Sequence, residues 1–306
     1  MPFARRRSFE WLLRTRTIPL GQRTVIMGIL NITPDSFSDG GHFYTPDDAP
    51  RRALTQALRM LDDGADILDI GGESTRPNAI PLNPAEEQSR ILPVIQAILK
   101  ERPCTILSVD TFHAATAQRA IEAGAEIVND VSGHLWDPAM STTCAELRCA
   151  AILMHTRGRP QEWTHLSPLA PDAVLVLVLT ELAERLKATT TAGIPRDKIV
   201  LDPGFGFGKI LDENYPLLAH LDQLRQFNLP ILAGASRKGF LARTLTEHPS
   251  LSALLNGDVP SIEDRLNATT AANTAAILAG AHILRTHDVR PAVEAAAIAD
   301  RILAAS

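Results

Sequence analysis

Polar and charged residues stand where several short apolar runs of this sequence end. Asp110, Asn129 and Asp202 each lie at such an end, and so do Asp69 and Arg285. An ionised carboxylate only accepts hydrogen bonds, so Asp202 could take the N–H and NH2 edge of a guanidine-like heterocycle. An asparagine can contact adjacent donors and acceptors. These residue types indicate a site for the edge of a pterin or purine ring.

Donors for an anion or a ring carbonyl occur in two later segments. In GASRKGF, Lys238 can donate to a ring carbonyl or nitrogen, and Ser236 and Arg237 beside it can donate to an anion. Arg285 and His287 end another apolar run, at a position where α/β barrels often hold phosphate. We therefore expect the site to accept an anionic group as well as a ring.

The glycine-rich run DPGFGFGK occupies residues 202–209. It is not a phosphate-binding P-loop, because too few residues separate Gly204 from Gly208 and Ile210 replaces the required Ser or Thr. We expect its glycines to let the backbone approach a flat ligand, with Phe207 packing against the ring. The alternative for Phe207 is that it only fills the core.

The stretch MGILNITPDSFSDGG, residues 27–41, joins an apolar run to a polar loop. The run ends at Asn31, and the loop carries two carboxylates, several hydroxyls and turn-forming residues. Phe37 is an aromatic residue with no helical or strand period that would bury it. An ordinary surface connection is the alternative, but these features favour a functional loop.

These residues need a scaffold, and short apolar runs alternate with amphipathic ones along the chain. Three segments predict helix starts: Thr45 to Asp48 and Asn83 to Glu86 offer a cap with an early proline and acids, and Ser261 to Asp264 is a capping box. The pattern predicts an α/β protein, a single (β/α)8 barrel over residues 24–306 with an N-terminal extension, 1–23, packing on it. The expected strands are Val25–Leu30, Ile67–Gly71, Thr105–Asp110, Ile127–Asp130, Ala151–Met154, Ile199–Asp202, Ile231–Ala233 and Ile283–Thr286.

An internal repeat supports the barrel. Segments 62–72, 122–133 and 278–288 each contain Gly-Ala, a variable residue, two aliphatic residues and then a polar one. Side chains alternate along a strand, so residues two apart point to the same side. Asp69 therefore points to the same side as Ile67, Asp110 to that of Ser108, and Asn129, Asp202 and Arg285 to that of the aliphatic residue two positions before each. They could therefore all point into the barrel mouth. For Asp69, internal hydrogen bonding within the barrel is the alternative.

Composition narrows the class of protein further. The chain has 306 residues, 45% of them hydrophobic and 21% charged, with a net charge of -5. A net negative charge does not indicate a basic surface for binding nucleic acid. The apolar runs are too short to span a membrane. The three cysteines form no C-x-x-C pair, and the charged N-terminus is unlike a signal peptide. We expect a cytoplasmic protein.

Several motifs together resemble the dihydropteroate synthase family of folate biosynthesis. They are MGILNITPDSFSDGG (27–41), DIGGESTRPNA (69–79), LSVDT (107–111), GAEIVNDVSG (124–133), MHTRGRP (154–160), DPGFGFGK (202–209), GASRKGF (234–240) and RTHDV (285–289). The resemblance implies a transferase, a target of sulfonamides, that condenses para-aminobenzoate with 6-hydroxymethyl-7,8-dihydropterin diphosphate. It also implies Mg2+ as cofactor and a homodimer.

The resemblance also implies roles for individual residues. Asn31 would lie at the magnesium site beside the diphosphate, and Arg285 with His287 would anchor that diphosphate. Asp35 and Arg76 would belong to two loops that close over the para-aminobenzoate side, and with Lys238 they are the expected catalytic residues. The pterin-binding set would comprise Thr75, Asp110, Asn129, Asp202 and Lys238, with Pro77, Phe207, Ser236 and Arg237 as further substrate-binding residues.

Departures from the family pattern leave alternatives open. Asn78 replaces a usual glycine in the second loop, and Ala268 replaces another glycine in RLNATTAAN. Residues 248–260 form a longer segment than usual, whose composition suggests an exposed loop. The rival functions are a pterin-binding methyltransferase domain, an aldolase that uses Lys238 as a Schiff base, and a pterin-binding paralogue without turnover.

Overall fold

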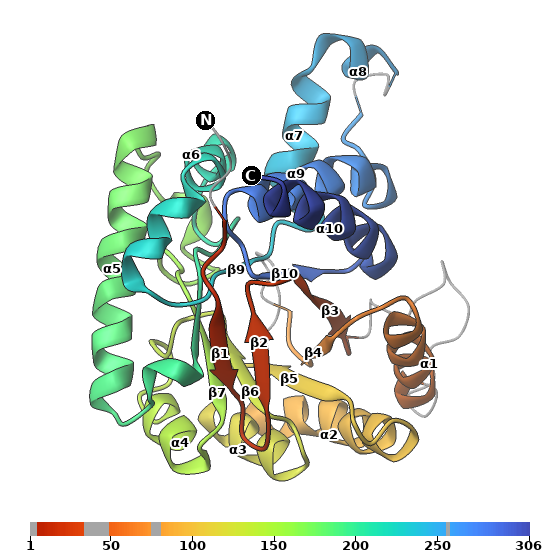
Figure 1. The fold of residues 1–306 in the computed structure, drawn as a ribbon, viewed down its shortest axis with the longest axis vertical. Coiled ribbons are helices and arrows are strands. Elements are labelled where there is room, and N and C mark those ends of the chain that lie inside the picture. The colour runs from red at the N-terminus through yellow and green to blue at the C-terminus, as the bar shows by residue number, and fades with distance from the viewer. Residues whose placement is uncertain (1–4, 34–48, 75–80, 255–257) are drawn as a thin grey trace.

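The computed structural model describes residues 5–33, 49–74, 81–254 and 258–306. Its centre is a sheet of eight parallel strands that neighbour one another in chain order (Figure 1). A bridge between Leu201 and Ile231 joins the last edges, so the sheet closes into a barrel. The strands are β3 (Val25–Asn31), β4 (Ile67–Gly71), β5 (Ile106–Asp110), β6 (Ile127–Asp130), β7 (Ala150–Met154), β8 (Ile199–Asp202), β9 (Leu232–Ala233) and β10 (Ile283–Thr286).

The predicted α/β barrel is confirmed, with strand ends that differ from the expected ones by one residue where they differ at all. Helices surround the barrel, and their apolar faces pack on the outward-facing strand residues (Figure 1). The α-helices are α1 (Ala49–Asp62), α2 (Pro84–Glu101), α3 (Ala114–Glu122), α4 (Met140–Leu147), α5 (Pro171–Thr191), α6 (Asn214–Ala219), α7 (Gly239–Glu247), α8 (Pro249–Leu254), α9 (Leu266–Leu278) and α10 (Val289–Ala304). Short 3-10 helices are η2 (Trp163–His165), η3 (Arg196–Lys198), η4 (Leu211–Glu213), η5 (Leu221–Phe227) and η6 (Glu263–Arg265).

A two-stranded antiparallel hairpin precedes the barrel and closes its amino-terminal end. Its strands, β1 (Phe9–Leu12) and β2 (Thr17–Leu20), lie across the barrel in Figure 1. Trp11 has no exposed surface and packs with the inward-facing residues at the start of the barrel strands, among them Met27 and Ile283. Its indole Nε1 donates to the Lys198 carbonyl at 3.1 Å. The hairpin therefore fills this end of the barrel with apolar side chains.

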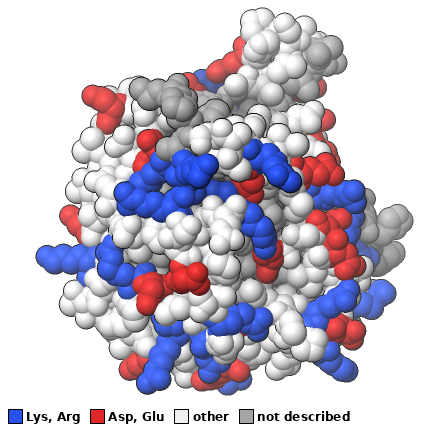
Figure 2. All heavy atoms as spheres, in the orientation of Figure 1, with Lys and Arg blue, Asp and Glu red and all other residues white. Residues whose placement is uncertain are grey.

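The surface around the hairpin carries charges of both signs. Figure 2 shows Lys and Arg side chains grouped on this face with Asp and Glu among them. Arg23 donates through Nη1 to Asp66 Oδ2 at 2.8 Å and through Nη2 to Asp66 Oδ1 at 2.6 Å. Arg16 Nε lies 2.7 Å from Glu126 Oε1. These arginines thus bind carboxylates of the barrel itself. Among the described residues, no helix is long and apolar enough to cross a membrane.

One expectation about the later part of the chain was wrong. The segment that begins at His248 was expected to be an exposed loop, but residues 249–254 form helix α8, which packs against α7. Proline suits the first turn of a helix because its missing N–H has no partner there, and the leucines and alanine that follow are good helix formers. The Ser, Asn, Gly, Asp and Pro residues of 248–260 had favoured a loop, and residues 255–257 of this segment lie outside the described residues.

The predicted capping boxes are present. The Asn83 side chain accepts from the Glu86 N–H at 3.0 Å, and the Glu86 carboxylate accepts from the Asn83 N–H at 3.3 Å. Ser261 and Asp264 make the same reciprocal pair ahead of η6 and α9. The predicted cap at residues 45–48 lies outside the described residues.

Removing the first of these caps should cause a small loss of stability. Asn83→Ala removes the side-chain acceptor at the start of α2 and should lower the free energy of unfolding by about 1 kcal/mol. Urea denaturation of the variant measures this loss. Ser89→Ala, an exposed site on the same helix, is the matched control and should change stability by less than about 0.5 kcal/mol. Equal stabilities of the two variants would contradict the role of the cap.

Candidate active site

A buried ion-pair cluster lies at the carboxyl ends of the barrel strands. The Arg285 guanidinium of β10 donates through Nε to Asp69 Oδ2 at 2.6 Å and through Nη2 to Asp110 Oδ2 at 2.5 Å. Asn129 of β6 donates to the same Asp69 oxygen at 2.8 Å. The other Asp69 oxygen is buried and has no hydrogen-bond partner in the described part of the chain. Four strands therefore bring one cation, two carboxylates and an amide together.

The environment changes the acidities of this cluster. Burial raises the pKa of Asp110 to about 7, although the charge of Arg285 acts in the opposite direction. Burial lowers the pKa of Arg285, but the carboxylates of Asp69 and Asp110 outweigh it, so that the pKa lies above its usual value. Arg285 thus stays charged, whereas Asp110 can gain or lose a proton near neutral pH.

Asp202 lies at the end of β8 next to this cluster. Its Oδ1 accepts from the Gly204 N–H at 2.7 Å. Its Oδ2 lies on the side of Gly234 and Arg285, because a Cβ built on Gly234 would stand 3.9 Å from both that oxygen and Arg285 Cδ. Burial raises the pKa of Asp202, and the N–H of Gly204 and the charge of Arg285 lower it. The two Asp202 oxygens thus have different surroundings, one at the Gly204 N–H and the other near Gly234 and Arg285.

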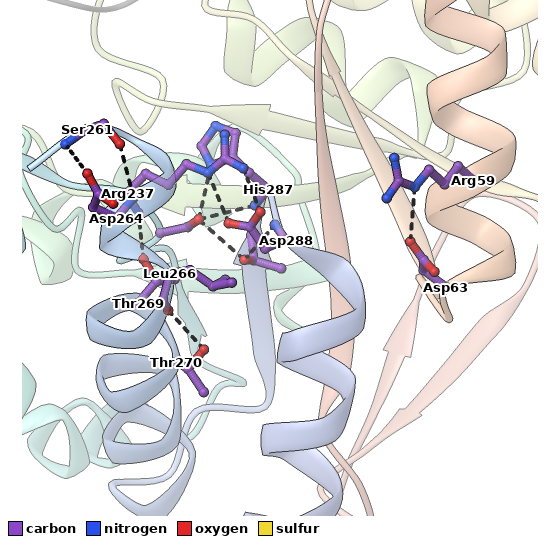
Figure 3. A network of polar contacts seen from close by, with 12 residues as sticks. Arg59, Asp63, Arg237, Ser261, Asp264, Leu266, Thr269, Thr270, His287 and Asp288 are labelled. Atoms are coloured by element: carbon purple, nitrogen blue, oxygen red, sulfur yellow. Dashed lines mark hydrogen bonds and ion pairs between the residues drawn. The ribbon is translucent and has the colours of Figure 1, made fainter.

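Ser236 and His287 lie together beside the cluster. Ser236 Oγ is 3.0 Å from His287 Nδ1 and accepts from the His287 N–H at 3.2 Å. Arg237, by contrast, points to Asp288, with bonds of 3.0 Å from Nε and 2.6 Å from Nη2 (Figure 3). The backbone N–H of Arg237 donates to Thr269 of α9. The structure thus engages Arg237, expected to bind an anion, in an ion pair within the protein.

The loop after β8 places Phe207 under Lys238. The Lys238 ammonium stands 3.9 Å from the centre of the Phe207 ring, and Trp163 meets the same ring edge-on at 5.4 Å. Phe207 is 7% exposed and also contacts Val131 and Met154. The ring is thus packed in a small apolar cluster of the protein, and its packing against a ligand ring stays a prediction.

Two glycines of this loop are required by the packing of the protein itself. Gly204 and Gly208 have positive φ angles of 69° and 68°. A Cβ on Gly204 would lie 1.9 Å from the His155 carbonyl oxygen, and one on Gly208 would lie 2.3 Å from that of Arg157. These two glycines are required by close contact with the loop after β7. A closely approaching flat ligand is not needed to explain them.

Asn31 fits the ligand type that Mg2+ prefers. It ends β3, and a Cβ on the neighbouring Gly71 would lie 3.6 Å from both Asn31 Oδ1 and Asp110 Oδ2. An amide and a carboxylate oxygen therefore flank one point on the rim. Mg2+ is commonly bound by one or two protein oxygens together with substrate phosphates and water. Among the described residues, no group of three His, Cys, Asp or Glu could hold a metal by itself.

Four of the expected site residues lie outside the described residues: Asp35, Thr75, Arg76 and Pro77. The base of the second loop is described. Glu73 accepts from the Leu82 N–H at 3.2 Å and lies 3.3 Å from His113 Nε2. This contact with Glu73 raises the pKa of His113.

Sequence reasoning missed two groups near the site. Lys209 is 5% exposed and donates to three backbone carbonyls. Glu87 is 1% exposed, accepts from Thr111 at 2.9 Å, and has a pKa raised by burial. Lys209 is the last residue of DPGFGFGK, but the sequence of this run gives no indication of its backbone partners. Glu87 looked like a first-turn acid of a helix and gave no other signal.

A closed barrel with a carboxylate, amide and arginine cluster at the carboxyl ends of its strands is the architecture of a barrel enzyme that binds a small molecule. The sequence profile of the pterin-binding enzymes matches residues 27–287. The chain belongs to this family, and its relatives place it among the dihydropteroate synthases, which are transferases.

Three relatives illustrate the similarity. Dihydropteroate synthase of Bacillus subtilis is 40% identical over 282 residues, which are 92% of this chain and 90% of the relative. The solved structure of Xanthomonas albilineans dihydropteroate synthase with 4-aminobenzoic acid is 38% identical, with a TM-score of 0.80 over 94% of this chain and 96% of the other. A mitochondrial folate synthesis bifunctional protein of Pisum sativum is 38% identical over 92% of this chain but only 54% of its own length. The chain thus spans about half of such bifunctional relatives.

Proposed function

We propose that this chain condenses para-aminobenzoate with 6-hydroxymethyl-7,8-dihydropterin diphosphate to give 7,8-dihydropteroate and pyrophosphate. The observation that carries the proposal is the convergence of Asp69, Asp110, Asn129, Asp202 and Arg285 in the mouth of a barrel whose relatives catalyse this step. The product would enter tetrahydrofolate biosynthesis.

The proposed pterin site uses the polar strand ends. Asp202 would accept from the N–H and NH2 edge through its Oδ2, which lies near Gly234 and Arg285. Asn129 and Asp110 would bind the other polar atoms of the ring. Lys238 would donate to the ring carbonyl or nitrogen from above Phe207. Each of these groups is held by neighbouring protein atoms, so the site is organised before the ligand binds.

The proposed chemistry requires little covalent work from the protein. The amine nitrogen of para-aminobenzoate forms a bond to the pterin methylene carbon and loses a proton to solvent, while the C–O bond breaks and the diphosphate leaves with the electron pair. Ser236, His287 and Arg285 would hold the diphosphate at the ends of β9 and β10. Asn31 would help to hold Mg2+, whose charge would stabilise the leaving group when the ion is bound. Positioning and charge stabilisation thus dominate.

Location and assembly are part of the same proposal. We propose a cytoplasmic homodimer, with the family resemblance as the support for the dimer. All three cysteines are free, which suits a reducing compartment.

The direct test mixes the protein with the pterin diphosphate, para-aminobenzoate and Mg2+ and measures pyrophosphate. We expect release that depends on all three. Release without para-aminobenzoate, or none at all, would contradict the proposal. Borohydride trapping with a carbonyl substrate tests the aldolase alternative, and we expect no adduct at Lys238 because that ammonium already lies against the Phe207 ring.

The para-aminobenzoate side is tested at the two proposed loop residues that lie outside the described residues. Asp35→Ala and Arg76→Ala should each lower turnover and para-aminobenzoate affinity by more than about tenfold. Binding of the pterin diphosphate should change by less than about tenfold, since its site is formed by the barrel strands. Steady-state kinetics at limiting para-aminobenzoate measures both effects. Wild-type kinetics in both variants would exclude these residues from the site.

A further inference from the structure

Lys209 makes an unusual set of contacts behind the proposed pterin site. Its ammonium donates to the backbone carbonyls of His155 at 2.9 Å, Pro203 at 2.8 Å and Gly204 at 2.8 Å. An ammonium has three donors and no acceptor, so all of its hydrogen-bonding capacity is used. Burial lowers the pKa of this lysine to about 7, and the charge of Asp202 acts in the opposite direction. The three contacts with carbonyl oxygens favour the ammonium form, because a neutral amine has only two N–H donors.

The three carbonyls belong to two loops in direct backbone contact. His155 follows β7, and Pro203 and Gly204 follow β8. The His155 N–H donates to the Asp202 carbonyl at 2.9 Å, and the Gly204 backbone lies so close to the His155 carbonyl that no side chain would fit between them. Carbonyl oxygens that point toward a common centre repel one another unless a cation lies between them. The Lys209 ammonium occupies that centre.

The turn held by Lys209 also orients Asp202. Gly204 donates through its N–H to Asp202 Oδ1 at 2.7 Å and accepts through its carbonyl from Lys209 at 2.8 Å. One peptide segment therefore connects the ammonium to the carboxylate. With Oδ1 bound in this way, Oδ2 lies near Gly234 and Arg285.

We propose that Lys209 is a positioning residue whose ammonium fixes the turn after β8 and thereby holds the Asp202 carboxylate in the orientation that binds the pterin. The proposal rests on the proposed function of the site. Lys209 itself contacts neither the ring nor the diphosphate, and acts through Gly204 and Asp202.

The test replaces the ammonium by an uncharged group of similar length. Lys209→Met should raise the KM for the pterin diphosphate by about tenfold or more, since Asp202 loses its fixed orientation. The KM for para-aminobenzoate should change much less. Lys198→Met is the matched control, because Lys198 also donates to a backbone carbonyl, that of Leu13, but at the opposite end of the barrel. Its kinetics should match the wild type.

A double-mutant cycle separates positioning from a merely structural role. If Lys209 acts through Asp202, the variant with both Lys209→Met and Asp202→Asn should bind the pterin no more weakly than Asp202→Asn alone. Additive losses would overturn the proposal. Lys209→Gln, whose amide can donate two of the three hydrogen bonds, should fold and give an intermediate KM.

The possible results distinguish a failure of the proposed function from a failure of the positioning role of Lys209. A wild-type protein without pyrophosphate release contradicts the proposed function. An active wild type with unchanged KM values in folded Lys209→Met or Lys209→Gln contradicts only the positioning role. Loss of folding in both variants, seen in thermal melts, would assign Lys209 to fold stability and would also overturn the positioning role.

Discussion

Replacing Arg285 by alanine should lower the free energy of unfolding by about 3 to 5 kcal/mol. The guanidinium binds Asp69, which has no exposed surface, and Asp110, which is largely buried. Removing it leaves two carboxylates near each other without their cation. The sequence alone indicated Arg285 as a diphosphate ligand, but these contacts also give it a role in stability. Urea denaturation of wild type and variant measures the loss.

The loss in Arg285→Ala should depend on pH. Burial already raises the pKa of Asp110 to about 7, and Arg285 is the group that most lowers it. Without Arg285 the folded protein should hold the Asp110 proton to higher pH. A carboxyl group with a raised pKa in the fold costs stability as pH increases from its unfolded value toward its folded value. The deficit should therefore be larger at pH 8 than at pH 5.

Arg23→Ala provides the matched control for Arg285→Ala. Arg23 also binds an aspartate through two hydrogen bonds, but 62% of its side chain is exposed. Its removal should lower stability by no more than about 1 kcal/mol at either pH. Equal losses for the two arginine variants would show that the Arg285 cluster is as solvated as a surface pair. If Arg285→Ala stays folded, its affinity for pyrophosphate can then test the anchoring role separately.

Asp202→Asn should weaken pterin binding by about tenfold to a hundredfold or more, which corresponds to a charged hydrogen bond of about 1.5 to 3 kcal/mol. The amide can keep its oxygen toward Gly204, so that its NH2 group would replace Oδ2. A donor would then face the donors of the pterin edge. Calorimetric titration of the folded variant with pterin diphosphate measures the change in affinity.

Asp66→Asn is the control for this variant. Asp66 accepts hydrogen bonds from Arg23 and the Ile26 N–H at the other end of the barrel, away from the strand ends that carry the site. It should bind the pterin as the wild type does. Wild-type affinity in Asp202→Asn would remove Asp202 from the proposed site.

The barrel strands and the directions of their polar residues could be predicted from the sequence. Each strand is a short apolar run, and a parallel sheet buried on both faces favours such runs. Because side chains alternate along a strand, parity placed Asp69, Asn129 and Arg285 on one side, where they meet. The ion pairs joining Arg285 to Asp69 and Asp110 could not be inferred, since they depend on which side chains from non-adjacent strands meet inside the barrel.

The N-terminal hairpin, the contacts of Lys209 and the ion pair of Arg237 could not be predicted from the sequence, each for a different reason. The strands of the N-terminal hairpin have four residues each, too few for an alternating pattern to stand out. The partners of Lys209 are backbone carbonyls, which have no sequence signature. Arg237 looked like an anion ligand because of its neighbours Ser236 and Lys238, but Asp288, far along the chain, binds its guanidinium.

The hairpin that fills the amino-terminal end of the barrel has a kinetic consequence. With Trp11 and Leu20 packed into that end, ligands can reach the strand-end cluster of the described structure only from the opposite side. A ligand bound at Asp202 and Asn129 then lies beneath one bound nearer the rim. The proposed pterin substrate should therefore arrive before para-aminobenzoate. Steady-state kinetics should show a compulsory order, with para-aminobenzoate unable to bind productively to the empty enzyme.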